Sequence, residues 1–484
     1  MAASMFRSSN FSKCVGFIQL RHTRHLQSIA VQEQNDEDAH YPPIKPKFPT
    51  GVWGKMDRKI AWHWDAKREK VAALSTAKDK INHLTENTFS IWKYNCVDTT
   101  PNLLDYQCKV TKTRIINGSL PVLYNDLGTE DGFDKEYEKF KQIVVDMLIQ
   151  EHELNRYRLE KKITIRDSHT PGPSRYTRDY QHSNSIVRGM LVNLLGILSG
   201  QRKDVFEGHV DNNVKVSACW SRDGYQRRKP RMMPNNKNYI LQNNTMFYGE
   251  HIVEYQIRKS LPLPQFVPIS DHLCHDLSYS DMPDYKPTVL GQFREKVPRR
   301  ITAGFNIGDA QQFSHLSIIF LNNRAMARMS LYGNKEKEQA DKGYAMGTGF
   351  LSTVAQAHVQ GFNEYEELTY PFTAQTILTD GRQFILSAYQ LNTLQLWKDD
   401  TANSLQNLCW IGENEELYEK YAGGKIVGFN DEVFERLLKF FLIKPCDRNG
   451  IDLSPNLKEP LAEVDIPDRK EFVTIEEEFQ YDRS

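Results

Sequence analysis

A β-hairpin is predicted by residues 370–397, which read YPFTAQTILTDGRQFILSAYQLNTLQLW. Apolar and β-branched residues, such as Leu378 and Phe384, lie on both sides of one Asp-Gly pair. Asp380 and Gly381 tolerate the positive φ values that a two-residue hairpin turn requires. Two strands can therefore pair over residues 372–396. Because a hairpin of this kind needs a sheet around it, this segment constrains the fold more than any other.

Helices and further strands are expected on both sides of the hairpin. The longest predicted helix spans 133–162, with acidic residues at its start and basic residues at its end, as the helix dipole favours. Asn430 is expected to cap a last helix at 431–443. The other expected helices span 58–83, 185–198 and 349–362, and the other expected strands span 214–220, 314–321 and 408–411. These elements predict an α+β fold, in which several helices pack a mixed sheet that includes the hairpin.

Changes in composition along the chain predict four regions. Residues 1–32 contain four basic residues but no acidic residue, which is typical of a mitochondrial transit peptide rather than a disordered tail. Residues 33–59 are rich in Pro and Gly and are expected to form an extended basic arm. Residues 60–450 are expected to form a single α+β domain. Residues 451–484, with ten acidic and four basic residues, are expected to form an extended acidic tail.

The whole chain carries no formal net charge, because 62 basic residues balance 62 acidic ones. A protein wrapped in nucleic acid should be basic, so the balance argues against that role but permits local basic patches. Seven cysteines without any CxxC pair are typical of thiols in a reducing compartment. The longest apolar run, residues 190–198, is far shorter than the roughly 20 residues of a membrane span. We therefore expect no membrane span.

No complete catalytic motif is found in the sequence. Walker A, GxGxxG and GxSxG patterns are missing. His152-Glu153 begins like a zinc-protease motif, but Arg156 stands where the second histidine should be. Three glycines have the wrong spacing for a phosphate loop and are expected to mark a helix start: Gly343, Gly347 and Gly349. The sequence therefore predicts a protein that is not an enzyme.

His272, Cys274 and His275 are metal ligands by residue type. Structural zinc sites need four ligands at regular spacing, and no distant pair completes this set. Coincidence is the favoured interpretation, so that no metal and no cofactor are expected. His358 is expected to be a packed or capping histidine rather than a base.

Three basic clusters stand out in the otherwise balanced sequence. One follows the strand expected at 214–220, one precedes residue 301, and one lies in the Pro-rich arm. Arginine matches phosphate oxygens, and aromatic side chains such as Trp220 and Tyr225 can stack on unpaired bases. A solvated or salt-bridged surface would explain one cluster, whereas three favour contact with RNA. The residues predicted to make this contact are Lys45, Lys47, Lys55, Arg222, Arg227, Arg228, Lys229, Arg231, Arg299 and Arg300.

Six short segments carry a family resemblance. They are AQAHVQGF (355–362), YPF (370–372), ILTDG (377–381), YQLNTL (389–394), NLCW (407–410) and GFNDEV (428–433). Together they resemble the mitochondrial ribosomal protein family known as small-subunit protein thirty or programmed cell death protein nine, now understood as part of the large subunit. The resemblance is strong over residues 355–445 and weak over 230–345.

The resemblance implies a non-catalytic structural protein of the mitochondrial large ribosomal subunit, bound to ribosomes in the matrix. It implies contact with large-subunit rRNA and with neighbouring ribosomal proteins, among them the related large-subunit protein thirty-seven. Membership in that related family is one alternative, and a free mitochondrial RNA-binding or assembly factor and a matrix enzyme are two others. Four aromatic residues are expected in the core rather than on RNA: Phe384, Tyr389, Phe434 and Phe441.

Overall fold

The structure is a computed structural model that describes residues 69–86, 91–94, 103–127, 133–160, 175–222, 245–276, 294–295, 301–321, 334–398, 403–448 and 450–456. The predicted transit peptide, the arm at 33–59 and the tail beyond residue 456 lie outside these residues. All described residues belong to one unit, Trp64–Ser484. The predicted domain boundaries at residues 60 and 450 remain predictions.

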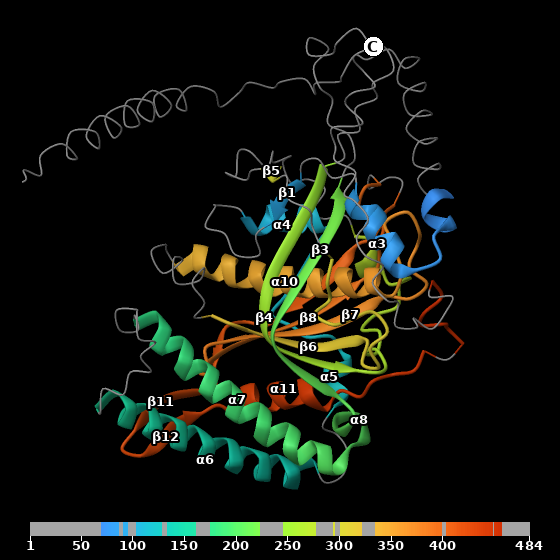
Figure 1. Cartoon of the computed structure of the whole chain (residues 1–484). Helices are drawn as coiled ribbons and strands as arrows, with labels where there is room; N and C mark the ends of the chain where they lie inside the picture. The colour runs from blue at the N-terminus through green and yellow to red at the C-terminus, as the bar shows by residue number, and fades with distance from the viewer. Residues whose placement is uncertain are drawn as a thin grey trace, which may run out of the picture. The chain divides into compact units, whose positions relative to one another are not determined.

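A mixed sheet lies at the centre of the described residues (Figure 1). Its strands are β1 (Ile91–Tyr94), β2 (Thr113–Asn117), β3 (His209–Arg222), β4 (Thr245–Lys259), β5 (Arg294–Glu295), β6 (Phe313–Phe320), β7 (Phe372–Thr379), β8 (Gln383–Leu391), β9 (Asn407–Ile411) and β10 (Glu415–Glu416). They follow the order β2-β9-β8-β7-β6-β4-β1-β5, with β10 beside β8 and β3 beside β4. The pairs β2–β9, β6–β7 and β1–β4 are parallel. A separate antiparallel hairpin consists of β11 (Tyr418–Ala422) and β12 (Lys425–Phe429).

The predicted hairpin is confirmed as β7 and β8, which pair along their length and join at a tight turn. The turn lies one residue later than expected. Gly381, at a φ of +93°, is its first central residue and Arg382 its second, and glycine at that first position is typical of a type II′ turn. Asp380 acts through its side chain, because Oδ1 accepts hydrogen bonds from the N–H groups of Arg382 (2.8 Å) and Gln383 (2.7 Å). β8 ends at Leu391 rather than at residue 396.

Helices cover both faces of the sheet (Figure 1). α10 (Asn334–Val359) crosses one face and packs on β3, β6, β7 and β8. α6 (Phe133–Glu160), α7 (Arg175–Gln201) and α11 (Asp431–Leu442) lie on the other, where they share a large apolar core with β4, β6, β7 and β8. The smaller elements are α3 (Ala77–Glu86), α4 (Leu103–Thr111), α5 (Leu123–Asp126), α8 (Lys203–Phe206) and the 3-10 helix η2 (His272–Cys274). The expected α+β fold is confirmed.

Most of the expected elements are confirmed near their expected positions. α6 and α11 match the helices at 133–162 and 431–443, β3 and β9 contain the strands expected at 214–220 and 408–411, and β6 covers all but the last residue of the strand expected at 314–321. Asn430 caps α11, since its side chain accepts hydrogen bonds from the N–H groups of Glu432 (3.1 Å) and Val433 (3.3 Å). α7 starts at Arg175 rather than at 185, because its first turns are polar and gave no apolar run. The four aromatic residues expected in the core are all buried: Phe384, Tyr389, Phe434 and Phe441.

The glycines at 343, 347 and 349 lie inside α10, so the expected helix start was wrong. α10 begins at Asn334. A Cβ atom on Gly349 would lie 2.7 Å from Cβ of the buried Tyr389 in β8, so glycine allows the helix to approach the sheet closely. The second half of α10 is buried all round, and it therefore lacks the amphipathic period of a surface helix.

The helix expected at 58–83 is interrupted. Residues 69–73 are helical, but α3 starts afresh at Ala77, and residues 58–68 lie outside the described residues. Thr76 explains the restart, because its Oγ1 accepts a hydrogen bond from the N–H of Asp79 (3.1 Å) and donates one to the Asp79 carboxylate (2.6 Å). A threonine in this position caps a new helix, which outweighs the helix-forming composition around it.

Candidate functional site

The YQLNTL segment supplies a buried amide clamp at the end of β8. Gln390 is fully buried, and its Oε1 accepts hydrogen bonds from the N–H groups of Phe266 (2.9 Å) and Val267 (3.1 Å). Its Nε2 donates to the carbonyl oxygen of Val267 (2.9 Å) and to Oδ1 of Asn392 (2.9 Å). One side chain therefore holds the loop that follows β4 against the hairpin.

Asn407, from the NLCW segment, forms a second clamp. Its Oδ1 accepts hydrogen bonds from the N–H groups of Asn392 (2.8 Å) and Thr393 (3.1 Å), and its Nδ2 donates to the carbonyl oxygen of Thr111 (3.1 Å). Asn392 in turn donates from Nδ2 to the carbonyl oxygen of Gln406 (2.7 Å). These residues are buried, and buried backbone groups need such partners. In the sequence these residues were recognised only as parts of a family signature. Their role in holding segments of the fold together was not predicted.

Arg222 is the one predicted RNA-binding residue among the described residues, and it is 5% exposed. Its Nε donates to the carbonyl oxygen of Lys109 (2.8 Å) and its Nη1 to that of Leu396 (3.0 Å). Trp220 is also buried and donates from Nε1 to the carbonyl oxygen of Val110 (3.1 Å). Both side chains therefore bind backbone carbonyl groups of the same chain and hold β3 against the end of α4. The sequence pattern placed Arg222 in a loop, whereas β3 extends two residues beyond Trp220 and includes Arg222.

The other predicted RNA-binding residues lie outside the described residues. They are Lys45, Lys47 and Lys55 in the arm, Arg227, Arg228, Lys229 and Arg231 after β3, and Arg299 and Arg300 before residue 301. The basic loop after β3 starts next to the described end of that strand. Its contact with RNA remains a prediction.

His272, Cys274 and His275 have separate partners. His272 is exposed and lies 3.0 Å from the Asp271 carboxylate. Cys274 is buried, its Sγ accepts a hydrogen bond from Nδ2 of Asn392 (3.4 Å), and burial raises the pKa of its thiol to about 11. The ring nitrogens of His275 lie near Ser404 (3.0 Å) and the carbonyl oxygen of Ile269 (3.1 Å). Within the described ranges, no group of three or more His, Cys, Asp or Glu residues is arranged to hold a metal ion.

His358 is a packed histidine, as expected. It is 2% exposed, and its ring nitrogens lie 3.1 Å from the carbonyl oxygen of Phe362 and 3.3 Å from that of Cys219. Burial lowers its pKa, which keeps the ring neutral. His152 is also in contact with its neighbours, since it stacks on Tyr421 with ring centres 4.9 Å apart. His358 thus connects α10 with β3, and His152 connects α6 with β11.

Glu254 in β4 is a buried carboxyl group whose Oε2 accepts a hydrogen bond from the N–H of Phe320 (3.2 Å). Burial raises the pKa of this carboxyl to about 8, so it holds a proton at neutral pH. The unfolded chain releases that proton near pH 4.5. Between these values the folded state binds more protons than the unfolded state, so stability falls as pH rises through 8.

Glu254→Gln is expected to weaken this pH dependence. Between about pH 6.5 and pH 8 the substitution should reduce the loss of unfolding free energy by about 1.5 kcal/mol, because one unit of pKa corresponds to about 1.4 kcal/mol. Urea unfolding of both proteins at the two pH values measures this difference. Glu250→Gln is the control, since hydrogen bonds from Lys215 and Tyr248 lower the pKa of Glu250 despite its partial burial. An unchanged slope in Glu254→Gln would show that Glu254 is ionised in the folded protein.

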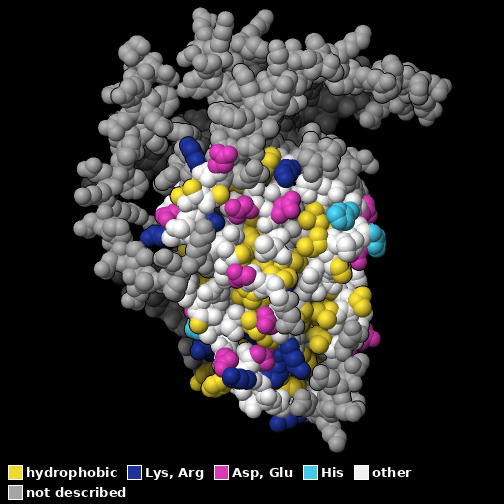
Figure 2. All heavy atoms as spheres, turned by 90° about the vertical axis from the view of Figure 1, so that its right-hand side faces the viewer, with side chains coloured by type: hydrophobic (Ala, Val, Ile, Leu, Met, Phe, Trp, Pro, Cys, Tyr) yellow, Lys and Arg dark blue, Asp and Glu magenta, His cyan; other side chains and the backbone are white. Residues whose placement is uncertain are grey.

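An apolar surface, the α8 patch, consists of Val192, Phe206 and Val210. These residues of α7, α8 and β3 are 64%, 74% and 45% exposed. Val210 lines a small cavity together with Leu195, one helical turn after Val192, and Val205, next to Phe206. Figure 2 views the protein from the right-hand side of Figure 1, where α8 lies, and shows hydrophobic side chains gathered in a band between charged ones. Large exposed apolar patches often mark contacts with other proteins, which makes this surface a candidate for such a contact.

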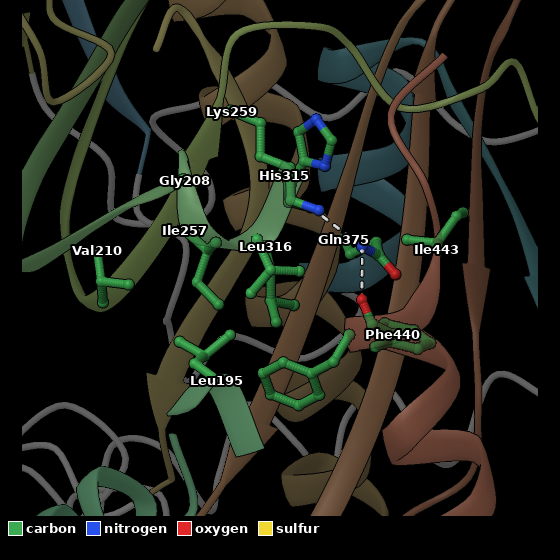
Figure 3. A pocket seen from close by; sticks show the side chains of 12 residues that line it. Leu195, Gly208, Val210, Ile257, Lys259, His315, Leu316, Gln375, Phe440 and Ile443 are labelled. Atoms are coloured by element: carbon green, nitrogen blue, oxygen red, sulfur yellow. Dashed lines mark hydrogen bonds between the residues drawn. The ribbon is translucent and has the colours of Figure 1, made fainter. Parts of the chain in front are cut away.

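The cavity beneath the α8 patch has a volume of about 30 Å³ and lies between β4, β6, α7 and α11 (Figure 3). Gln375 joins its walls, since Nε2 donates to the carbonyl oxygens of His315 (3.4 Å) and Phe440 (3.2 Å). Burial lowers the pKa of His315 to about 3, which leaves the ring neutral. A space of this size holds a water molecule, whereas ligand pockets are several times larger. The cavity is therefore no cofactor site.

No helix among the described residues has both the length and the apolar character that crossing a membrane requires.

Comparison with known families places the chain among the mitochondrial ribosomal proteins. It belongs to the family described as Mitochondrial 28S ribosomal protein S30 (PDCD9), which matches residues 9–445. The match confirms the resemblance predicted from the six segments, and it extends through the middle region where that resemblance was weak. Membership in this family implies a mitochondrial protein with a ribosomal role.

Two curated relatives show a more distant similarity. A Gallus gallus protein named Large ribosomal subunit protein mL37 is 26% identical over 148 residues, which are 28% of this chain and 32% of that protein. A Bos taurus protein of the same name is 30% identical over 105 residues, which are 19% of this chain and 24% of that protein. The chain thus matches about a third and a quarter of the length of these relatives. This similarity agrees with the predicted kinship to large-subunit protein thirty-seven.

Proposed function

We propose that this chain is a non-catalytic structural component of the large subunit of the mitochondrial ribosome. The family match over residues 9–445 carries the ribosomal role. The family description bears a 28S label, a small-subunit designation, whereas both similar relatives are named as large-subunit proteins. The similarity to those relatives supports the large subunit. That the related protein mL37 is one of the neighbours is part of the proposal and rests on the family resemblance alone.

The buried signature residues support a scaffolding role. The side-chain amides of Gln390 and Asn407 form hydrogen bonds with the backbone of the same chain. Contacts with partners then come from the surface: the basic loop after β3 would contact rRNA, and the α8 patch would contact a neighbouring protein. Arg222 is left out of the proposed RNA contacts because it is buried.

The basic loop after β3 is tested by replacing Arg227, Arg228, Lys229 and Arg231 with alanine in the full chain. Each lost phosphate contact lowers affinity, because binding to a phosphate backbone releases counterions, and a complex with fewer contacts reaches its dissociation point at a lower salt concentration. The variant is expected to leave mitochondrial ribosomes at lower salt than the wild type, with an unchanged melting temperature. Sedimentation of mitochondrial lysates through sucrose gradients at two salt concentrations measures this. Equal retention of both proteins at high salt would show that the loop does not contact RNA.

Phe206→Asp serves as the matched comparison for the α8 patch. Loss of an apolar contact weakens binding at every salt concentration, so its effect should be much less salt-dependent than that of the loop variant. Lys203→Ala on the same short helix, where the side chain is 85% exposed, should leave association unchanged. If Phe206→Asp sediments like the wild type, the α8 patch faces solvent in the ribosome.

A further inference from the structure

β2 stands at one end of the sheet order and pairs only with β9 among the described residues. The N–H of Asn407 bonds the carbonyl oxygen of Lys112 (2.9 Å), and the N–H of Gly118 bonds that of Ile411 (2.8 Å). Alternate residues of a strand point their backbone groups to opposite sides. Even-numbered residues of β2 therefore face β9, and the N–H and C=O groups of Ile115 and Asn117 face outward. Those groups meet no backbone partner in the part of the chain that the structure describes.

Apart from its short length of five residues, this outer edge has few of the features that usually protect a free strand. Proteins blunt such edges with proline, lysine, bulges or unpaired inward charges. β2 reads TRIIN, and its one cation, Arg114, is neutralised by Asp276 at 2.7 Å. Ile115 is half-buried and Asn117 is exposed, so both residues keep some contact with solvent.

A cavity of about 300 Å³ continues from the end of β2. Gly118, Ser119 and Leu120, the three residues that follow the strand, form one of its walls. The other lining residues include the apolar Phe384, Leu386 and Val433. Val122 stands two residues beyond Leu120 and is 71% exposed, which adds apolar surface next to this wall.

The charged residues around this cavity are already paired within the chain. Arg436 makes two hydrogen bonds to the Glu415 carboxylate, and Lys439 lies 2.9 Å from Glu435. Their positive charges are therefore balanced, and the cavity offers little attraction for a phosphate backbone. Unpaired backbone groups at two-residue spacing beside an apolar hollow instead fit an extended peptide, which offers backbone partners and alternate side chains.

We propose that the outer edge of β2 and this cavity form a docking groove for an extended segment of a neighbouring protein. The segment pairs with Ile115 and Asn117 as an added strand and places an apolar side chain between Leu120 and Val433. At about 3.3 Å per residue, roughly five residues reach from Ile115 to the cavity. The identification of the neighbour as a ribosomal protein rests on the proposed function. The observation of the open edge is independent of it.

Hydrogen–deuterium exchange of the full chain, alone and in the isolated large subunit, tests the groove. The N–H groups of Ile115 and Asn117 should exchange fast in the free protein and at least about tenfold more slowly in the subunit. The N–H of Ile116 faces β9 and should be protected in both, which makes it the internal reference. Fast exchange at Ile115 in the subunit would overturn the proposal. If the chain is missing from the subunit altogether, the proposed function fails instead.

A variant and a cross-link identify the occupant. Ile115→Pro removes an outward N–H, which an edge strand tolerates, and it should weaken subunit association about fivefold without changing the melting temperature. Asn117→Ala keeps the backbone donor and should bind normally. A benzophenone side chain at position 117 should cross-link to a protein segment in the assembled subunit. A cross-link to rRNA would contradict the proposal, and should Ile115→Pro fail to fold, exchange and cross-linking still decide it.

Discussion

Asn407→Ala is expected to lower the free energy of unfolding by about 4 kcal/mol, because three buried backbone groups each lose a hydrogen bond at a cost of about 1–3 kcal/mol. These groups are the N–H of Asn392, the N–H of Thr393 and the carbonyl of Thr111. The first two belong to adjacent residues and the third to a distant segment, so no local rearrangement replaces all three partners. The loss is a large share of the roughly 5–15 kcal/mol that stabilises a typical domain.

Thermal and urea unfolding of the purified full chain measure this effect, together with the yield of soluble protein. Asn414→Ala is the matched control, since Asn414 is exposed and makes one long hydrogen bond, 3.5 Å to Gln383. It should change stability by less than about 0.5 kcal/mol. Equal stability of the two variants would show that the amide clamp does not hold the fold.

Gly349→Ala is the second large expected effect, a loss of about 2–3 kcal/mol even though alanine favours a helix by about 1 kcal/mol. The added Cβ would lie 2.7 Å from Cβ and 3.0 Å from Cγ of Tyr389. Tyr389 cannot turn away easily, because it is buried and its hydroxyl lies 2.7 Å from that of Thr113. The helix must therefore shift on the sheet, which overpacks the core.

Gly196→Ala on α7 gives the opposite sign and is the control. No atom lies within 4 Å of the position of its added Cβ, so only the helix propensity changes. Stability should rise by up to about 1 kcal/mol. The two alanine variants differ in whether the added Cβ atom contacts neighbouring atoms. The sign of each change in melting temperature therefore tests the packing of α10. A stabilised Gly349→Ala would contradict the close approach of α10 to β8.

Local chemistry in the sequence predicted much of the fold. Alternating apolar residues and a glycine marked β7 and β8, and Asn430 marked the start of α11. The first half of α10 escaped prediction because residues 334–342 are mostly charged or polar and offer no apolar run, and the glycines that follow were interpreted as a helix start. The position of Thr76 as a cap could be read only once its bonds to Asp79 were seen.

The candidate site was predicted less well, because its residues meet only in three dimensions. Gln390 and Asn407 were recognised as parts of a signature, but their partners at Phe266 and Thr111 lie more than a hundred residues away. Arg222 looked like the first residue of a basic loop. Its guanidinium instead donates hydrogen bonds to the carbonyl oxygens of Lys109, in the last turn of α4, and Leu396. The open edge of β2 depends on the order of strands in the sheet, which no local pattern reveals.

Sedimentation of mitochondrial lysate through sucrose gradients at moderate and high salt tests the central claim most directly. Detection of this chain with the large subunit and with the intact ribosome at both salt concentrations is the predicted result. Sedimentation with the small subunit would contradict the large-subunit placement and support the 28S label of the family. Recovery only at the top of the gradient would contradict the structural role itself and favour a free RNA-binding factor or an enzyme.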